Sequence, residues 1–269
     1  MKRFALGLAA SMLIAVLPSA GLAQETVLRV STGPGDVSTL DPHRASATND
    51  KAVVGWIYNA LVRFKPGSSE PRDIEPDLAE RWQVSEDGKV WTFHLRTGVR
   101  FHGDWGTLSA DDVVYSIQRA GDPRRSTFSS DFAAIDRVEK VDDLTVRITL
   151  KYGDVNFLGR VSNYHGGNIV SRRAAEELGD KFGTRPVGTG PFHFVEQVTQ
   201  QHVKLAAHAG YFRGKPKIDA IMVRVIPSDS ARELAFTSGE LDMMYGRREQ
   251  RWVDAARRRS GYNVEIFQP

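Results

Sequence analysis

Residues 81–119 read RWQVSEDGKVWTFHLRTGVRFHGDWGTLSADDVVYSIQR, and this stretch decides the fold. The Asp-Gly dipeptide at 87–88 is a two-residue turn signal, so the segments on either side of it are expected to fold back as an antiparallel hairpin. Two apolar cross-strand pairs follow from this register, Val84 with Trp91 and Trp82 with Phe93. One face of the hairpin is therefore apolar and the other polar, which is typical of a ribbon packed on one side only.

A helix is expected directly after the hairpin. Ser109 is a suitable N-cap, and Asp111 and Asp112 occupy the first turn, where the helix dipole favours negative charge. Apolar residues recur at i, i+3, i+4 and i+7, namely Ala110, Val113, Val114 and Ile117. This spacing predicts a stripe that faces a core.

The stretch resembles the signature segment of the peptide- and nickel-binding class of extracytoplasmic solute-binding proteins (family 5), which are the receptors of ABC importers. The similar blocks are LDPHRASATNDKAVVGWIYNALVRF (40–64), PDLAERW (76–82), FHLRTGVRFH with SADDVVYSIQR (93–119), VGTGPFHFVE (187–196) and YFRGKPKIDAIMVRVIPSDSARELAFTSGELD (211–242). Five blocks in the family's order carry the resemblance over nearly all of the chain after residue 25.

The resemblance implies an α/β fold, with a mixed sheet decorated by antiparallel ribbons. It implies the first lobe of a type II periplasmic binding protein, with an extra subdomain at roughly residues 50–180. Family members are longer than this chain and have a second lobe. Residues 24–269 are therefore expected to form an N-terminal lobe that ends near the hinge, truncated by comparison with the family.

Sequence patterns predict the other elements. Apolar alternation and helical spacing indicate a strand at 26–32, a helix capped by Asn49 or Asp50 and bearing Val53, Val54, Ile57 and Leu61, a strand at 62–65, a bulged ribbon at 137–150, a helix at 172–178 after Ser171, a ribbon containing Phe192 and Phe194, a strand at 218–226, a helix from Ser228 to Phe236, a strand at 241–245 and a strand starting at Asn263. The order of the later elements is that of a βαβ unit.

The N-terminus has the pattern of a secretory signal peptide. Lys2 and Arg3 precede an apolar run from Phe4 to Leu17, and small residues lead to an expected cleavage after Ala23. With no cysteine in the chain, a lipid anchor at the cleavage point is not expected. A diffusible periplasmic protein is the prediction, and it is expected to be a monomer at full length.

The charge balance argues against nucleic acid. The chain has 36 Lys and Arg and 33 Asp and Glu, and removal of residues 1–23 leaves 34 basic residues and a net charge of +1. Six arginines lie close together in one predicted helix, Arg247, Arg248, Arg251, Arg257, Arg258 and Arg259. No signature of a nucleic-acid-binding module accompanies them, so a solvated helix face explains them.

The resemblance implies a protein that binds a solute, with peptides as the expected substrates, and that docks on the permease subunits of an importer. Its loops imply the ligand contacts Ser46, Ala47, Thr48, Asn49, Tyr164, His165, Met244 and Tyr245. Because some relatives carry nickel or haem, that alternative keeps His165 and the pair Met243 and Met244 as pocket residues, although methionines in a short strand are more often core. No catalytic residue, metal site or cofactor is expected.

Two alternatives from other classes remain open at this point. A secreted metal-assisted hydrolase would use His165, His193 and His202, since His193 and His202 could meet across a ribbon. An interaction module would use the edge of the strand expected from Asn263. The segment Gly188 to Pro191 lacks the lysine and spacing of a P-loop, so a tight turn before a strand is its interpretation.

Overall fold

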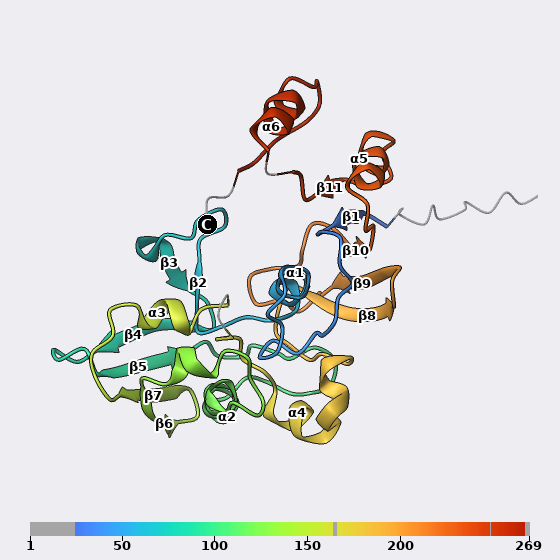
Figure 1. Ribbon diagram of the computed structural model, residues 1–269. Helices are drawn as coiled ribbons and strands as arrows, with labels where there is room; N and C mark the ends of the chain where they lie inside the picture. Colours follow the sequence, from blue (N-terminus) through green and yellow to red (C-terminus); the bar gives the residue numbers. More distant parts are fainter. Residues whose placement is uncertain (1–24, 164–165, 248, 267–269) are drawn as a thin grey trace, which may run out of the picture.

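The computed structural model describes residues 25–163, 166–247 and 249–266. The expected signal peptide (1–23), its cleavage site and the candidate contacts Tyr164 and His165 lie outside the described residues. Strands and helices form an α/β fold with a five-stranded mixed sheet, a four-stranded antiparallel sheet and a two-stranded ribbon (Figure 1). Within the described segments, no helix is both long and apolar enough to cross a membrane.

The predicted hairpin is the centre of the four-stranded sheet. Its strands are β4 (Ala79–Val84), β5 (Val90–Leu95), β7 (Thr145–Leu150) and β6 (Ile135–Asp142), in the order β4-β5-β7-β6. The predicted register is confirmed, with Val84 opposite Trp91 and Trp82 opposite Phe93. The β6–β7 ribbon carries register shifts at both of its ends, which confirms the expected irregularity.

The apolar face of this sheet packs under the short helix α3 (Phe157–Arg160). The ring centroids of Trp91 and Phe157 are 5.3 Å apart, and those of Phe93 and Phe157 are 6.4 Å apart. Phe93 is fully buried and Trp91 is 8% exposed, whereas Val84 at the hairpin tip is 49% exposed. The apolar face is therefore buried at its centre and open at its tip, which the sequence pattern did not distinguish.

Helix α2 (Ala110–Gly121) begins where predicted and lies beside β6 and β7 (Figure 1). The carboxylate of Asp112 accepts hydrogen bonds from the backbone N–H of Ser109 at 3.0 Å and from its hydroxyl at 2.8 Å. Three residues of the predicted stripe, Ala110, Val113 and Ile117, are buried, and Val114 is half-buried. The stripe thus faces the core, as its spacing predicted.

The five-stranded sheet has the order β11-β1-β10-β9-β8. Its strands are β1 (Val27–Ser31), β8 (Phe192–Val198), β9 (His202–Ala207), β10 (Ala220–Arg224) and β11 (Met243–Met244). Strand β1 runs parallel to β10 and β11, and helix α5 (Asp229–Thr237) joins those two strands across it. The βαβ prediction is confirmed, although β10 and β11 are shorter than predicted.

Helix α1 (Thr48–Ile57) starts before both of the predicted caps, Asn49 and Asp50. Its N-cap is Ala47, and Asp50 lies inside the first turn, where its carboxylate accepts from the backbone N–H of Ser38 at 2.8 Å and from the Ser38 hydroxyl at 2.6 Å. The prediction of Asn49 or Asp50 as cap is wrong because both side chains bond to the segment that precedes the helix. Leu61 is buried but lies beyond the helix end.

The remaining elements complete the covering layers. They are β2 (Val62–Phe64), β3 (Ile74–Pro76), α4 (Arg172–Leu178), α6 (Gln250–Arg257) and three short 3₁₀ helices at Pro71–Asp73, Ser129–Phe132 and Gly179–Gly183. The Ser171 side chain caps α4, as predicted, by accepting from the backbone N–H of Ala174. No strand forms at residues 263–266, so the strand predicted there is wrong over its described part.

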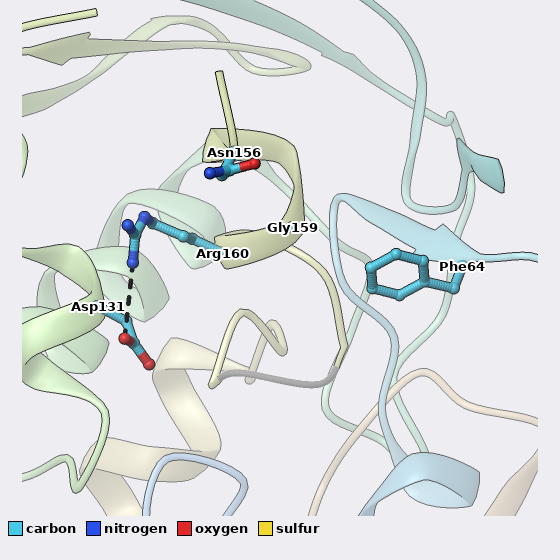
Figure 2. A pocket seen from close by; sticks show the side chains of 5 residues that line it. All are labelled: Phe64, Asp131, Asn156, Gly159 and Arg160. Carbon is cyan, nitrogen blue, oxygen red and sulfur yellow. Dashed lines mark ion pairs between the residues drawn. The ribbon is translucent and has the colours of Figure 1, made fainter. Parts of the chain in front are cut away.

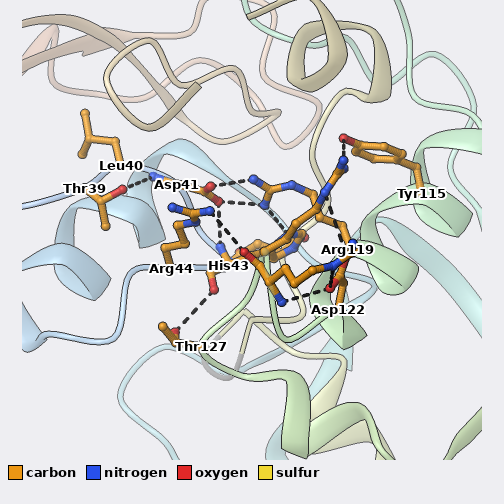
Figure 3. A network of polar contacts seen from close by, with 12 residues as sticks. Thr39, Leu40, Asp41, His43, Arg44, Tyr115, Arg119, Asp122 and Thr127 are labelled. Atoms are coloured by element: carbon orange, nitrogen blue, oxygen red, sulfur yellow. Dashed lines mark hydrogen bonds and ion pairs between the residues drawn. The ribbon is translucent and has the colours of Figure 1, made fainter. Parts of the chain in front are cut away.

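A buried ion pair fixes the segment between β1 and α1 (Figure 3). The guanidinium of Arg119 donates to both carboxylate oxygens of Asp41, at 2.9 and 2.6 Å, and the two side chains are 10% and 6% exposed. Arg119 also lies 2.7 Å from Nδ1 of His43, whose Nε2 lies 3.0 Å from the carbonyl of Asn168. The network joins α2, the segment before α1 and the chain that leads to α4.

The protonation states in this network follow from its donors and acceptors. A guanidinium only donates and a carbonyl only accepts, so His43 is neutral and carries its hydrogen on Nε2. Burial and the neighbouring Arg119 lower the pKa of His43 to about 4. Burial alone would raise the pKa of Asp41, but the hydrogen bonds and charge of Arg119 outweigh it and hold that pKa below its ordinary value.

Gly188 and Gly190 allow the backbone to approach the carboxyl end of α1. The N–H of Gly190 donates to the carbonyl of Ile57 at 2.9 Å, and a Cβ on Gly190 would lie 2.5 Å from the carbonyl oxygen of Trp56. A Cβ on Gly188 would overlap the Ile57 carbonyl oxygen. Neither glycine has a positive φ. Close approach, rather than the expected tight turn, is therefore the reason for glycine here.

Substitution of Gly188 with alanine is expected to lower the free energy of unfolding by at least about 2 kcal/mol, because the added methyl group must displace helix backbone. Denaturant unfolding of the purified chain measures this loss. Gly55→Ala is the matched control, since a Cβ at this position of α1 meets nothing within 4 Å. Alanine there should stabilise the helix by about 0.5–1 kcal/mol. Equal effects of the two substitutions would contradict the close approach.

Candidate functional site

The parallel strands β1, β10 and β11 end at one edge of the five-stranded sheet. In open α/β sheets, ligands bind outside the carboxyl ends of parallel strands. Ser31 at the end of β1 pairs with Met244 of β11, and the backbone N–H of Tyr245 donates to the Ser31 carbonyl at 3.0 Å. We call this region, made of Ser31, residues 32–35, Ser46–Asn49 and Met244–Tyr245, the carboxyl edge.

Asn49 ties the loop after β1 to the first turn of α1. Its Nδ2 donates to the carbonyl of Gly35 at 2.6 Å. Gly33 has a φ of 137°, and a Cβ at Gly33 would lie 2.9 Å from Oδ1 of Asn49. Glycine is therefore required at 33 both for its backbone conformation and for the space that Asn49 occupies.

The structure brings most of the described sequence-predicted contacts to this edge. Asn49 reaches it through the loop at 33–35 and is 9% exposed, while Met244 and Tyr245 reach it through Ser31. Tyr245 is 53% exposed and Met244 half-buried. The other three predicted contacts, Ser46, Ala47 and Thr48, are exposed at the amino end of α1. Met243, expected in the core, is 47% exposed, because β11 is the outer strand of the sheet.

Ser31 is a site residue that the sequence reasoning missed. Its side chain is 1% exposed, and its hydroxyl oxygen has no hydrogen-bond partner among the described residues. A buried polar atom without a partner is uncommon and marks a place where a ligand or water can bond. The signal was one serine at the end of an apolar strand. Arg29, paired with Asp242 at 2.7 Å, holds β1 against the residue before β11.

A depression lies between β2 and α3 (Figure 2). Its lining residues are Phe64, Asp131, Asn156, Gly159 and Arg160. The guanidinium of Arg160 lies 2.7 Å from Asp154 and 3.6 Å from Asp131. Because two carboxylates already neutralise this cation, the depression offers no free positive charge to a ligand.

The expected meeting of His193 and His202 is wrong. The β8–β9 register places His193 opposite Ala206 and His202 opposite Val198, and His202 lies 3.2 Å from Glu196 instead. Among the described residues, no group of three or more His, Cys, Asp or Glu side chains is arranged to hold a metal ion. The hydrolase hypothesis therefore loses the pair of His193 and His202 on which it depended, and its third residue, His165, lies outside the described residues.

Sequence comparison places the chain among known proteins. The family described as "Bacterial extracellular solute-binding proteins, family 5 Middle" matches residues 73–266. Heme-binding protein A of Haemophilus influenzae is 37% identical over 222 residues, which cover 73% of this chain and 39% of that protein. Di/tripeptide-binding protein 2 of Pseudomonas aeruginosa is 35% identical over 245 residues, which cover 82% of this chain and 45% of that protein.

Solved structures agree with this result. The solute-binding protein MoaA of A. tumefaciens R10, in complex with mannopinic acid, has a TM-score of 0.84 and 49% identity, covering 87% of this chain and 47% of its own. The periplasmic binding protein DppA of Helicobacter pylori, in complex with the peptide STSA, has a TM-score of 0.76 and 32% identity, covering 88% and 50%. The chain spans about half the length of the relatives that it matches, and it belongs to the family 5 bacterial extracellular solute-binding proteins, which are not enzymes.

Proposed function

We propose that the carboxyl edge is the solute-contacting surface of a periplasmic receptor for an ABC importer, and that its solute is a short peptide. The observation that carries the proposal is the Ser31 hydroxyl, which has no partner among the described residues and lies at the carboxyl ends of parallel strands, where the Ser31 carbonyl bonds to exposed Tyr245. This is the position at which open α/β sheets bind ligands. The exposed residues Ser46–Thr48 lie next to Asn49, which bonds to the loop after β1.

The chemistry of the edge suits the main chain of a peptide. The nearby carboxylate of Asp50 is occupied by two donors from Ser38, and Asn49 bonds to Gly35, so hydroxyl and backbone groups are what the edge offers. Strand β11 is the outer strand of its sheet. An extended peptide could pair with the outer side of β11 through backbone hydrogen bonds, alongside Met244 and Tyr245 of the carboxyl edge.

An opine is the second candidate. The relative in complex with mannopinic acid is 49% identical to this chain, whereas the di/tripeptide-binding relative and the peptide complex named above are 35% and 32% identical. An opine and a short peptide both present polar groups derived from amino acids. The two candidates therefore fit the same edge and need to be separated by measurement.

The proposal extends to organisation and location. Residues 24–269 form the N-terminal lobe, with an extra subdomain at roughly 50–180 that contains the four-stranded sheet. Residues 1–23 direct export and are removed after Ala23, and the lobe then docks on the permease. These points rest on the family, on the separate four-stranded sheet and on the signal-peptide pattern.

Calorimetric titration of the purified chain with pooled di- to pentapeptides, and separately with mannopinic acid, tests the solute. Ala47→Trp should abolish the heat signal by filling the edge, while Val84→Trp at the hairpin tip should leave it unchanged. Binding that survives Ala47→Trp would contradict the assignment of the edge, and a signal with mannopinic acid alone would select the opine.

A further inference from the structure

Three histidines from separate segments lie together at the carboxyl end of α1. His102 precedes α2, His193 belongs to β8, and His208 follows β9. The ring centroids of His102 and His208 are 4.9 Å apart, and those of His102 and His193 are 6.0 Å apart. His102 is 5% exposed. None of these imidazoles takes part in the carboxyl edge.

One carbonyl determines how two of these rings are protonated. The oxygen of Gly190 lies 2.9 Å from Nε2 of His102 and 3.2 Å from Nδ1 of His208. A carbonyl can only accept, so both of these ring nitrogens carry hydrogen, and in the neutral form of each ring the other nitrogen carries none. That other nitrogen of His102, Nδ1, is buried and has no hydrogen-bond partner among the described residues.

The segment from Gly188 to Gly190 connects His102 to the carboxyl end of helix α1. The backbone N–H of His102 donates to Gly188 at 2.9 Å, and the N–H of Gly190 donates to Ile57, the last residue of α1, at 2.9 Å. We propose that His102, His193 and His208 form an acid-sensitive clamp, which holds the carboxyl end of α1 while the rings are neutral and releases it when they are protonated.

The positions of the three rings make protonation unfavourable while the clamp holds the helix. A proton on Nδ1 of His102 would create a buried N–H without an acceptor, and a second proton would place two cations about 5 Å apart. Among the described residues, the charge of Arg100, which belongs to the same segment as His102, also acts on His208. At the helix end, Tyr58 bonds to the Leu40 carbonyl, and the nearby Arg173 bonds to the carbonyl of Asp104.

The pKa values of all three histidines are lowered, as expected if the folded cluster disfavours protonation. Burial lowers the pKa of His102 to about 3, and burial with His208 lowers that of His193. Burial and Arg100 also lower the pKa of His208, although its bond to Gly190 opposes them. A depressed pKa stabilises the closed form above the ordinary histidine pKa of about 6.5, and this stabilisation is lost as the pH falls below that value.

Release of the carboxyl end of helix α1 would affect the carboxyl edge, because the same helix carries Asn49 at its other end. Helix α1 has ten residues and is therefore about 15 Å long, with Asn49 in its first turn and the clamp at its last residue. Acid would then weaken solute binding without a titrating group at the edge. This consequence rests on the proposed function, whereas the clamp does not, so the experiment measures the clamp alone.

Hydrogen exchange of the Gly190 amide in the full chain, corrected for intrinsic rates, tests the clamp between pH 7 and 5. Its protection factor should fall about tenfold per pH unit below about pH 6 for each proton taken up on opening. The amide of Leu150, which donates to Lys89 in the four-stranded sheet, should keep a higher protection factor and report global unfolding. A Gly190 protection factor that is independent of pH, or that only follows Leu150, overturns the proposal.

Two neutral replacements keep the bond to Gly190 but cannot take up a proton. His102→Gln places an amide N–H near the former Nε2, and His208→Asn places one near the former Nδ1. Each replacement removes one proton-binding ring, so the fall of the Gly190 protection factor should become less steep by about a factor of ten per pH unit. Should His102→Gln fail to fold, the less buried His208 decides alone. His202→Gln, on the same ribbon but outside the cluster, is the control and should retain the wild-type slope. If His102→Gln and His208→Asn also retain the wild-type slope, the clamp is overturned.

Discussion

Replacement of Arg119 with methionine is expected to lower the free energy of unfolding by about 3–5 kcal/mol, because it leaves the carboxylate of Asp41 buried without its cation. Asp41 is 4% exposed, and both of its oxygens accept from Arg119. The same substitution removes the donor to Nδ1 of His43. Methionine retains much of the arginine stem, so the loss reports the charge and its hydrogen bonds. Denaturant unfolding at pH 7 measures it.

Arg124→Met is the matched control. Arg124 pairs with Asp122 at 3.1 Å, but its side chain is 88% exposed. Exposed ion pairs contribute between zero and about 1 kcal/mol, so this change should be nearly silent. A loss at Arg119 that is no larger than the loss at Arg124 would show that the Asp41 network is accessible to water.

Trp91→Ala is expected to cost about 3–5 kcal/mol in the free energy of unfolding, since it removes a buried aromatic side chain from the centre of the apolar face. The indole packs on Phe157, stacks on Phe93 at 6.4 Å between centroids, and donates to the Gly88 carbonyl at 3.2 Å. Urea unfolding, followed by circular dichroism, measures the change.

Val84→Ala controls for the cross-strand position. Val84 faces Trp91 in the hairpin but is 49% exposed, so its truncation should cost less than about 1 kcal/mol. A Trp91→Ala loss below about 1 kcal/mol would mean that the face under α3 is not a packed core.

The local features of the fold could be predicted from the sequence. The hairpin register follows from one turn dipeptide and cross-strand symmetry, and the α2 stripe follows from helical spacing, so each needs only residues that are close in the chain. Element ends depend on distant partners. Asp50 looked like a helix cap, but Ser38 bonds to it from the preceding segment, and β11 is short because only Val30 and Ser31 pair with it.

The candidate site was less accessible to sequence reasoning. Ser46–Asn49 and Met244–Tyr245 came from the family resemblance, since no periodicity relates segments about 200 residues apart. The burial of Ser31 without a partner, and the approach of Gly188 to Ile57, are properties of packing that composition does not encode. The two ribbon histidines were mispaired because the ribbon turns at residues 199–201, where Val198 faces His202, and this register sets His193 opposite Ala206.

Chemical-shift mapping tests the central claim most directly. The amide resonances of the isotope-labelled chain would be followed while the solute selected by calorimetry is added to millimolar concentration. We predict that perturbations concentrate at Ser31, residues 32–35, Ser46–Asn49 and Met244–Tyr245, and spare the four-stranded sheet. Saturable perturbations confined to that sheet or to the depression at Phe64 and Arg160, with the carboxyl edge unaffected, would contradict the account.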